Sequence, residues 1–294
     1  MLSNNTKIGL VTVLYNSIEV LEDFFQSLYN QSYKNYILYI IDNSPNDDTL
    51  NEAIKLSNKF NINSIFINNN DNLGVAKGNN QGIEKALQNG CEYVLLLNND
   101  IVFNESTVEN LITYTLINNI DIIVPKIYYH NTNKLWMAGG YISNIKGTTP
   151  HRGEFEEDKG QYENIEEINY APTCFMLISK KVFERVGLMD EKYFVYYDDS
   201  DFIYRTNKEG FKIVYFPNAT VYHKVSISTG GSESLFSIYY VNRNRLYFIR
   251  KNFSFMYKNI SLFYFFFTRF IKYFSFNKEQ RKTLLKGIFD SFKM

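Results

Sequence analysis

The first hundred residues alternate short apolar runs with longer segments in which apolar residues recur at helical spacing. The β-branched apolar runs predict four buried strands, at residues 8–15, 36–42, 64–68 and 93–97. The helical spacing predicts three helices between them, at residues 18–30, 49–60 and 78–89. Because strands and helices alternate, we expect an α/β fold with a mostly parallel central sheet flanked by helices.

The alternation ends near residue 124. Residues 136–153 show no clear period, and residues 154–167 are strongly acidic, so both segments are expected to be irregular or solvated. Shorter elements follow, with strands predicted at 169–179, 213–216 and 219–223 and helices at 180–186 and 198–209. From residue 234 onward the pattern is helical. The chain therefore divides into an α/β domain, residues 1–232, and a helical appendage, residues 233–294.

Charge is distributed unevenly between these two parts, although the formal net charge is zero. Residues 241–294 hold 12 Lys/Arg and 2 Asp/Glu, and the rest of the chain holds 19 and 29. A basic, aromatic tail on an acidic body indicates that the two parts of the chain have different tasks and contact different surroundings. The acidic body would repel a phosphate backbone, so no nucleic-acid partner is expected.

The tail raises the question of a membrane. Its uncharged aromatic stretch, residues 259–268, is 10 residues long, about half of the ~20 that a spanning helix needs. We expect the tail to lie on a membrane surface, with packing against protein as the alternative. Residues 1–7 lack the apolar segment of a signal peptide. Cys91 and Cys174 lie in apolar runs and are read as reduced core thiols, which fits the cytoplasm.

Polar side chains follow three of the predicted strands at the point where each strand ends. These clusters are Tyr15-Asn16, Asp42-Asn43 and Asn98-Asn99-Asp100. Ligands gather at the carboxyl ends of strands in such sheets, so the clusters mark a candidate binding edge. Asp100 offers a hard oxygen to a divalent cation, although Asn and Asp also follow strands for turn reasons alone.

Three carboxylates lie within residues 198–201. Asp198 and Asp199 follow an apolar, aromatic run, and crowded carboxylates raise one another's pKa, which suits a general base. Asp201 lies four residues before Arg205, and this spacing predicts a plain surface ion pair. His223 ends a predicted strand and becomes a candidate ligand only if it converges on Asp100.

A glycine-rich segment, residues 72–82, opens the third predicted helix and contains Lys77. Backbone N–H groups and a cation at a helix start can hold phosphate. The alternative is that small residues let this helix pack closely on the sheet. The segment matches neither the Walker nor the Rossmann pattern.

In order and spacing, these pieces resemble the family 2 glycosyltransferases of the GT-A fold, in particular the rhamnosyltransferase-like branch. The resemblance spans residues 7–251 without a break and depends on the ordered set of motifs. The matching segments are residues 11–16, 40–44, 72–74, 79–82, 96–100, 176–178, 186–191 and 196–201, His223, and residues 240–244.

The resemblance implies roles for single residues. Asp42 is expected to contact the base of a nucleotide donor, within a donor-binding set of Val13, Tyr15, Asn16, Asp42, Asn43, Gly74, Lys77, Asn98 and Asn99. Asp100 closes an Asp-X-Asp-like motif that holds Mn²⁺ or Mg²⁺ on the diphosphate, with His223 as a second ligand. Imidazole beside carboxylate slightly favours Mn²⁺. Asp199 matches the catalytic base, and Asp198 is its neighbour.

The implied activity is an inverting, metal-dependent transfer of a sugar from a nucleoside-diphosphate donor to a polysaccharide or lipid-linked glycan. The setting implied is the inner face of the cell membrane. dTDP-rhamnose is favoured, with UDP-hexose, UDP-galactofuranose or a UDP-amino sugar as alternatives, and a homo-oligomer is left open. The sequence departs from the family pattern at Asn98, where the first Asp of the metal motif is common, and at Thr173, where Gly is common.

Two other classes of function remain. One is a non-catalytic subunit that binds a nucleotide sugar and scaffolds an assembly. It is disfavoured because Asp42, Asp100, Asp199 and His223 are all present. The other is a nucleotidyltransferase, which would want a basic glycine-rich loop directly after the first strand, where this chain has Tyr15-Asn16-Ser17.

Overall fold

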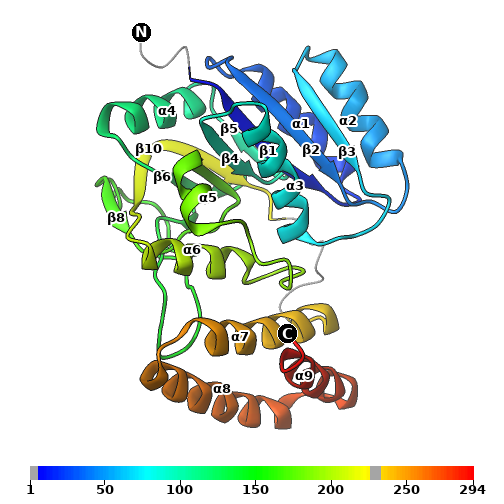
Figure 1. Cartoon of the computed structure of the whole chain (residues 1–294), viewed down its shortest axis with the longest axis vertical. Coiled ribbons are helices and arrows are strands. Elements are labelled where there is room, and N and C mark those ends of the chain that lie inside the picture. Colours follow the sequence, from blue (N-terminus) through cyan, green and yellow to red (C-terminus); the bar gives the residue numbers. More distant parts are fainter. Residues whose placement is uncertain (1–5, 226–232) are drawn as a thin grey trace.

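The computed structural model describes residues 6–225 and 233–294. Its centre is a ten-stranded sheet with the strand order β3-β2-β1-β4-β9-β6-β10-β5, to which β7 adds beside β6 and β8 beside β10. Helices pack around this sheet, and three C-terminal helices lie together at one end of the molecule (Figure 1).

The first half of the sheet matches the predicted alternation. Its elements are β1 (Ile8–Leu14), α1 (Ile18–Tyr29), β2 (Tyr36–Asp42), α2 (Asp48–Lys59), β3 (Ser64–Asn68), α3 (Val75–Gln88) and β4 (Tyr93–Leu97). The strands β3, β2, β1 and β4 are parallel to one another. Their carboxyl ends therefore meet at one edge, as the sequence predicted.

Helix α3 begins three residues earlier than expected, at Val75, directly after Gly74. Gly74 has a φ of 83°, and a Cβ there would lie 2.4 Å from the Phe194 carbonyl oxygen. Within the helix, a Cβ on Gly82 would lie 2.3 Å from Val11. Gly82 thus allows α3 to pack closely on β1, which is the alternative left open for this segment, and Gly74 allows the close approach of Phe194.

The second half of the sheet is mixed, with both parallel and antiparallel pairs of strands. Its elements are β5 (Ile101–Phe103), α4 (Thr107–Asn118), β6 (Ile122–Tyr129), β7 (Leu135–Met137), β8 (Glu166–Ile168), β9 (Phe175–Ser179), α5 (Lys180–Val186), α6 (Asp198–Lys208) and β10 (Ile213–His223). Strand β9 runs antiparallel between β4 and β6. Hydrophobic periodicity identifies a buried strand but carries no information on its direction.

Three strand predictions in this half were wrong in extent. The strand expected from residue 169 begins only at Phe175. The two strands expected before and after residue 217 form one strand, β10, whose pairing with β6 shifts register between Phe216 and Thr220. Such a bulge interrupts the alternation of a continuous strand and makes it read as two.

The C-terminal helices are α7 (Leu235–Asn252), α8 (Phe255–Ser275) and α9 (Lys278–Ser291). Helix α7 lies between the sheet domain and α8, with α9 beside it (Figure 1). Tyr193 of the sheet domain packs in one buried cluster with Phe248 of α7 and Phe265 of α8. The predicted domain boundary at residue 232 lies outside the described residues. Within those residues, no helix is both long and apolar enough to cross a membrane.

Candidate active site

Two carboxylates, Asp198 and Asp199, open helix α6 at the end of an unusual turn. The preceding residues Tyr196 and Tyr197 have φ values of 63° and 67°, a left-handed conformation that costs about 1 kcal/mol or more for a residue with a Cβ. Such a turn persists only where its surroundings hold it. Asn244 of α7 supplies that support.

The Asn244 side-chain amide donates to the carbonyl oxygens of Val195 and Tyr196 at 2.7 and 2.9 Å. Its own carbonyl oxygen accepts from Arg243 at 2.8 Å, which fixes the amide in the donating orientation. Asn244 is fully buried. The first of the C-terminal helices therefore holds the turn that presents the two carboxylates.

The two carboxylates differ in their partners. Asp199 accepts hydrogen bonds from the Tyr170 hydroxyl at 2.7 Å and the Ser200 backbone N–H at 2.6 Å. Burial raises the pKa of Asp199, and these hydrogen bonds oppose the rise. Burial, with the charge of Asp199 as the next cause, raises the pKa of Asp198 to about 8. Asp199 is thus the more easily ionised member of the pair, and only the ionised carboxylate can accept a proton.

Asp100 and His223 lie in contact. This is the condition under which His223 becomes a candidate metal ligand. Strand β5 begins directly after Asp100 and pairs antiparallel with β10, where His223 lies opposite Ile101. This register places His223 Nε2 3.0 Å from Asp100 Oδ1. Both residues are buried.

The pair fits a divalent cation that takes its other ligands from phosphate. His223 Nδ1 is buried and has no hydrogen-bond partner in the described structure. Across residues 6–225 and 233–294, no group of three or more His, Cys, Asp or Glu side chains could hold a metal by itself. One or two protein ligands completed by substrate phosphates are the usual arrangement for Mg²⁺ at nucleotide sites.

The predicted donor residues cluster at the ends of β1 and β2. Asp42 is fully buried, and its Oδ1 accepts from the Ser44 backbone N–H at 3.0 Å and the Ser44 hydroxyl at 2.6 Å. The Ser44 hydroxyl also accepts from the Asn16 backbone N–H at 3.0 Å. Asp42 Oδ2 has no partner in the described structure. That oxygen can accept a hydrogen bond from an N–H of a nucleotide base.

The remaining donor candidates surround this cluster. Asn43 donates to the Gly74 carbonyl oxygen at 3.0 Å and so joins β2 to the start of α3. Tyr15 is 46% exposed, which leaves its ring available for contact. Three others are half-buried: Val13, Lys77 and Asn99. Asn99 donates to the Ser17 hydroxyl.

A pocket of about 530 Å³ brings together Asn98, Asp198, Asp199 and His223. Thr173, one of the two positions at which the sequence departs from the family pattern, lines the pocket as well. Neither Asp42 nor Asp100 belongs to its lining. The pocket therefore joins the base candidate to one of the two metal candidates, and Asn98 is the one donor candidate in its lining.

Sequence reasoning missed Trp136 and Tyr170, which line the pocket, and His151, whose ring contacts both of them. The Trp136 ring packs edge-to-face against His223 and His151, with centroid distances of 4.6 and 4.5 Å. Burial lowers the pKa of His151 to about 4, so it is neutral at physiological pH. One available signal was that the segment predicted as irregular contains the single Trp of the chain.

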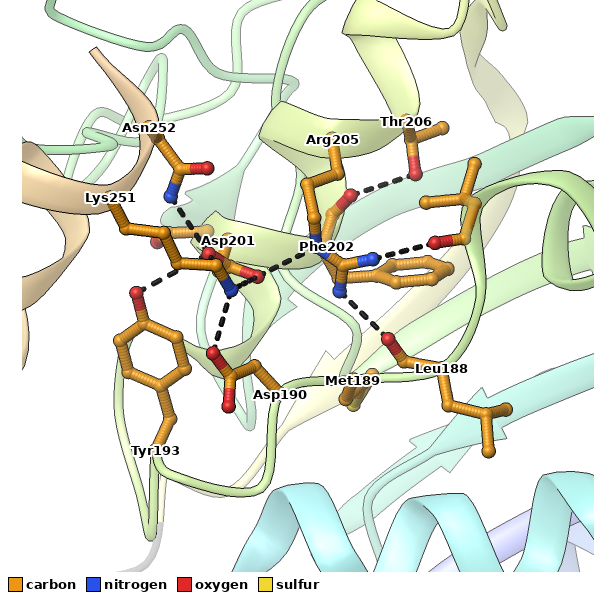
Figure 2. A network of polar contacts seen from close by, with 12 residues as sticks. Leu188, Met189, Asp190, Tyr193, Asp201, Phe202, Arg205, Thr206, Lys251 and Asn252 are labelled. Carbon is orange, nitrogen blue, oxygen red and sulfur yellow. Dashed lines mark hydrogen bonds and ion pairs between the residues drawn. The ribbon is translucent and has the colours of Figure 1, made fainter. Parts of the chain in front are cut away.

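The predicted ion pair of Asp201 with Arg205 is present, but the prediction that it lies on the surface was wrong. The pair with Arg205 exists at 2.8 Å, but the Asp201 side chain has 0% exposure. Figure 2 shows Asp201 at the centre of a network in which Lys251 and Asn252 of α7 reach its carboxylate, at 2.9 and 2.7 Å. Lys251 also pairs with Asp190 at 2.6 Å. Asp201 thus joins α6 to the tail, a contact that local sequence spacing does not reveal.

A family model described as "Glycosyl transferase family 2" matches residues 10–187, more than half of the chain. The chain belongs to glycosyltransferase family 2.

This chain is also similar to two curated relatives. The low-salt glycan biosynthesis hexosyltransferase Agl10 of Haloferax volcanii is 29% identical over 184 residues, which cover 61% of this chain and 58% of that protein. The dTDP-rhamnosyl transferase RfbF of Shigella flexneri is 27% identical over 256 residues, which cover 84% of this chain and 81% of that protein.

Among solved structures, this chain is similar to S. aureus TarS 1–349. The TM-score is 0.64 at 16% identity, with 98% of this chain and 80% of that chain covered. The structure of the same protein in complex with UDP-GlcNAc gives a TM-score of 0.65 at 15% identity, with 98% and 81% covered. At these identities the likeness establishes the fold, which is GT-A, as predicted.

Proposed function

We propose that this protein is an inverting, metal-dependent glycosyltransferase that moves a sugar from a nucleoside-diphosphate donor to a glycan hydroxyl. The observation that carries the proposal is the pocket in which Asp199, hydrogen-bonded by Tyr170, faces the same cavity as His223, the partner of Asp100. A base and a cation pair around one cavity are what a single displacement at an anomeric carbon needs.

In this proposal Asp199 removes the proton of an acceptor hydroxyl, and the oxygen of that hydroxyl attacks the anomeric carbon at the same time. The bond from that carbon to the donor diphosphate breaks, and the diphosphate leaves with the bonding electrons. A single displacement inverts the configuration. Asp198, held largely protonated near neutral pH by burial and by its neighbour, does not compete for the proton.

Asp100 and His223 are the residues proposed to hold Mn²⁺ or Mg²⁺. When bound, such a cation neutralises charge that develops on the departing diphosphate. Asp42 is proposed to accept a hydrogen bond from the donor's base through Oδ2. Val13, Tyr15, Asn16, Asn43, Gly74, Lys77, Asn98 and Asn99 complete the proposed donor site.

Rhamnose is the favoured sugar, because a relative that covers 84% of this chain is named as a dTDP-rhamnosyl transferase. A UDP-hexose, UDP-galactofuranose or UDP-amino sugar is the alternative, supported by the hexosyltransferase relative and by the fold shared with a UDP-GlcNAc complex. The acceptor is proposed to be a polysaccharide or lipid-linked glycan. The place of action is proposed to be the inner face of the cell membrane, reached from the cytoplasm by peripheral association.

The test is donor binding and turnover with purified protein. dTDP-rhamnose, UDP-galactose, UDP-glucose and UDP-N-acetylglucosamine are compared by calorimetry, with Mn²⁺ or with EDTA, for the wild type and Asp199→Asn. Metal-dependent binding of one donor, with turnover lost and binding kept in the variant, is the expected result. Binding without turnover in the wild type, even with a crude lipid acceptor, would favour the scaffold function. Failure to bind any donor would refute the donor site.

A further inference from the structure

Helix α8 carries an exposed apolar face along its whole length. Met256, Ile260, Phe263, Phe267, Phe270 and Phe274 are separated alternately by four and three residues, so they share one side of the helix. All six are exposed, and Phe263 reaches 75%. We call these six side chains the α8 face. Twenty-one residues at 1.5 Å each make the helix about 31 Å long.

The opposite side of α8 is bound to the protein. Phe265 is fully buried and lies under the guanidinium groups of Arg245 and Arg269, 5.4 and 5.8 Å from its ring centroid. Arg269 also donates to Asn242 of α7 at 2.9 Å. The α8 face therefore points away from α7 and the sheet domain, on the outermost helix of that end of the molecule (Figure 1). An exposed apolar face along a helix whose other side packs on the protein marks a docking surface.

Charge accompanies this surface. Residues 255–294 contain eight Lys/Arg and two Asp/Glu. Helix α9 exposes Lys282 and Lys286 next to the exposed Leu285 and Phe289. An exposed aromatic, apolar face on a segment of net positive charge is complementary to the headgroup region of a bilayer that contains anionic lipid.

A second copy of the chain fits the face less well. Two copies joined through α8 about a two-fold axis would bring the same cationic segments together, without a matching set of acids. The α8 sequence also contains no Gly or Ala, so large side chains project from its face and leave no shallow groove for another helix.

We propose that the α8 face inserts into the surface of an anionic bilayer, with α8 lying in the membrane plane and the lysines of α9 contacting lipid headgroups. This proposal gives the peripheral association in the proposed function a defined element and orientation. Vesicle binding is measured without donor or acceptor, so its failure is distinguishable from failure of the catalytic assignment.

The experiment is vesicle co-sedimentation of the full chain. Vesicles of phosphatidylcholine mixed with phosphatidylglycerol are compared with vesicles of phosphatidylcholine alone. The variant is Phe263→Ser with Phe270→Ser, and the matched control is Ile117→Ser with Phe155→Ser, two exposed apolar residues of the sheet domain. Lys282→Glu with Lys286→Glu tests the cations. Light scattering gives the mass of each protein, and circular dichroism checks its folding.

The expected result is binding to the mixed vesicles that falls about tenfold or more in the α8 variant and in the lysine variant, and is unchanged in the control. Failure of the wild-type protein to bind either kind of vesicle would overturn the proposal. So would a wild-type dimer that the α8 variant converts to a monomer, since the face would then be a contact between copies. Equal binding to both vesicles, unaffected by the lysine variant, would refute the anionic-lipid part.

Discussion

The Tyr170 hydroxyl donates a hydrogen bond to Asp199 Oδ2 at 2.7 Å. This contact distinguishes two carboxylates that are adjacent in the chain and share a buried turn. Tyr170 comes from an irregular segment before β9, whereas Asp199 opens α6. It stabilises the charged form of Asp199, which is the form that can accept a proton.

Replacing Tyr170 by Phe removes this hydrogen bond and leaves the ring in place. The pKa of Asp199 is expected to rise, so the acidic limb of the kcat–pH profile should move to higher pH. The measurement is turnover against pH at saturating donor. Tyr162→Phe, which removes a hydroxyl bound to the exposed Glu156, should leave the profile unchanged. An unmoved acidic limb in the Tyr170 variant would show that Asp199 is not the base.

Removing His223 should weaken the use of the metal. For His223→Ala, we expect the Mn²⁺ concentration at half-maximal turnover to rise by about tenfold or more, because a proposed ligand and its contact with Asp100 are lost. Binding of the nucleoside without phosphates should stay the same. If the metal requirement were unchanged, His223 would have only the packing role seen in its contact with Trp136.

Asp198 should make stability depend on pH. Its pKa is raised from 3.8 to about 8 in the folded protein, so the folded state retains a proton that the unfolded chain loses. Linkage then lowers the free energy of unfolding as pH rises from about 4 to about 8. Asp198→Asn should remove this loss and raise the Tm relative to wild type at pH 8 but not at pH 4. Thermal melts at both values check it, and a Tm difference that does not vary with pH would contradict it.

The Asp201 network should be important for stability. Asp201→Asn leaves Arg205 and Lys251 facing a neutral, fully buried side chain, and we expect the free energy of unfolding to fall by about 3 kcal/mol. Glu52→Gln removes an exposed pair with Lys55 and should change it by less than about 1 kcal/mol. Denaturant titration measures both. Equal effects would mean that the network does not hold α6 to the tail.

Asn244 should affect turnover more than donor binding. Asn244→Asp cannot donate to the carbonyl oxygens of Val195 and Tyr196, so the turn before Asp198 should shift and kcat should fall, by up to about a hundredfold. The KM for the donor should stay within about twofold, because the donor site lies on other elements. Asn259→Asp, the same change on an exposed helix position, is the control. A change in KM alone would place Asn244 in donor binding instead.

The sequence by itself determined the parallel half of the sheet. Runs such as Tyr36–Asp42 and the helical spacing before and after them follow from local burial, and each element was found within three residues of its predicted start. The ordered motifs also indicated the family, because polar residues follow successive strands in the order and spacing on which the resemblance depends. These features are local, or depend on order along the chain, and order is what a sequence records.

Only the tertiary structure decided the rest. The direction of β9, the burial of Asp201 and the support of Tyr196 by Asn244 depend on contacts between segments far apart in the chain. Local spacing predicted an exposed Asp201–Arg205 pair because the helix alone would leave it exposed, and α7 buries it. The meeting of Asp100 and His223 likewise depends on the pairing of β5 with β10. Periodicity reports which residues avoid water, but the partner that covers each one is set by how the whole chain packs.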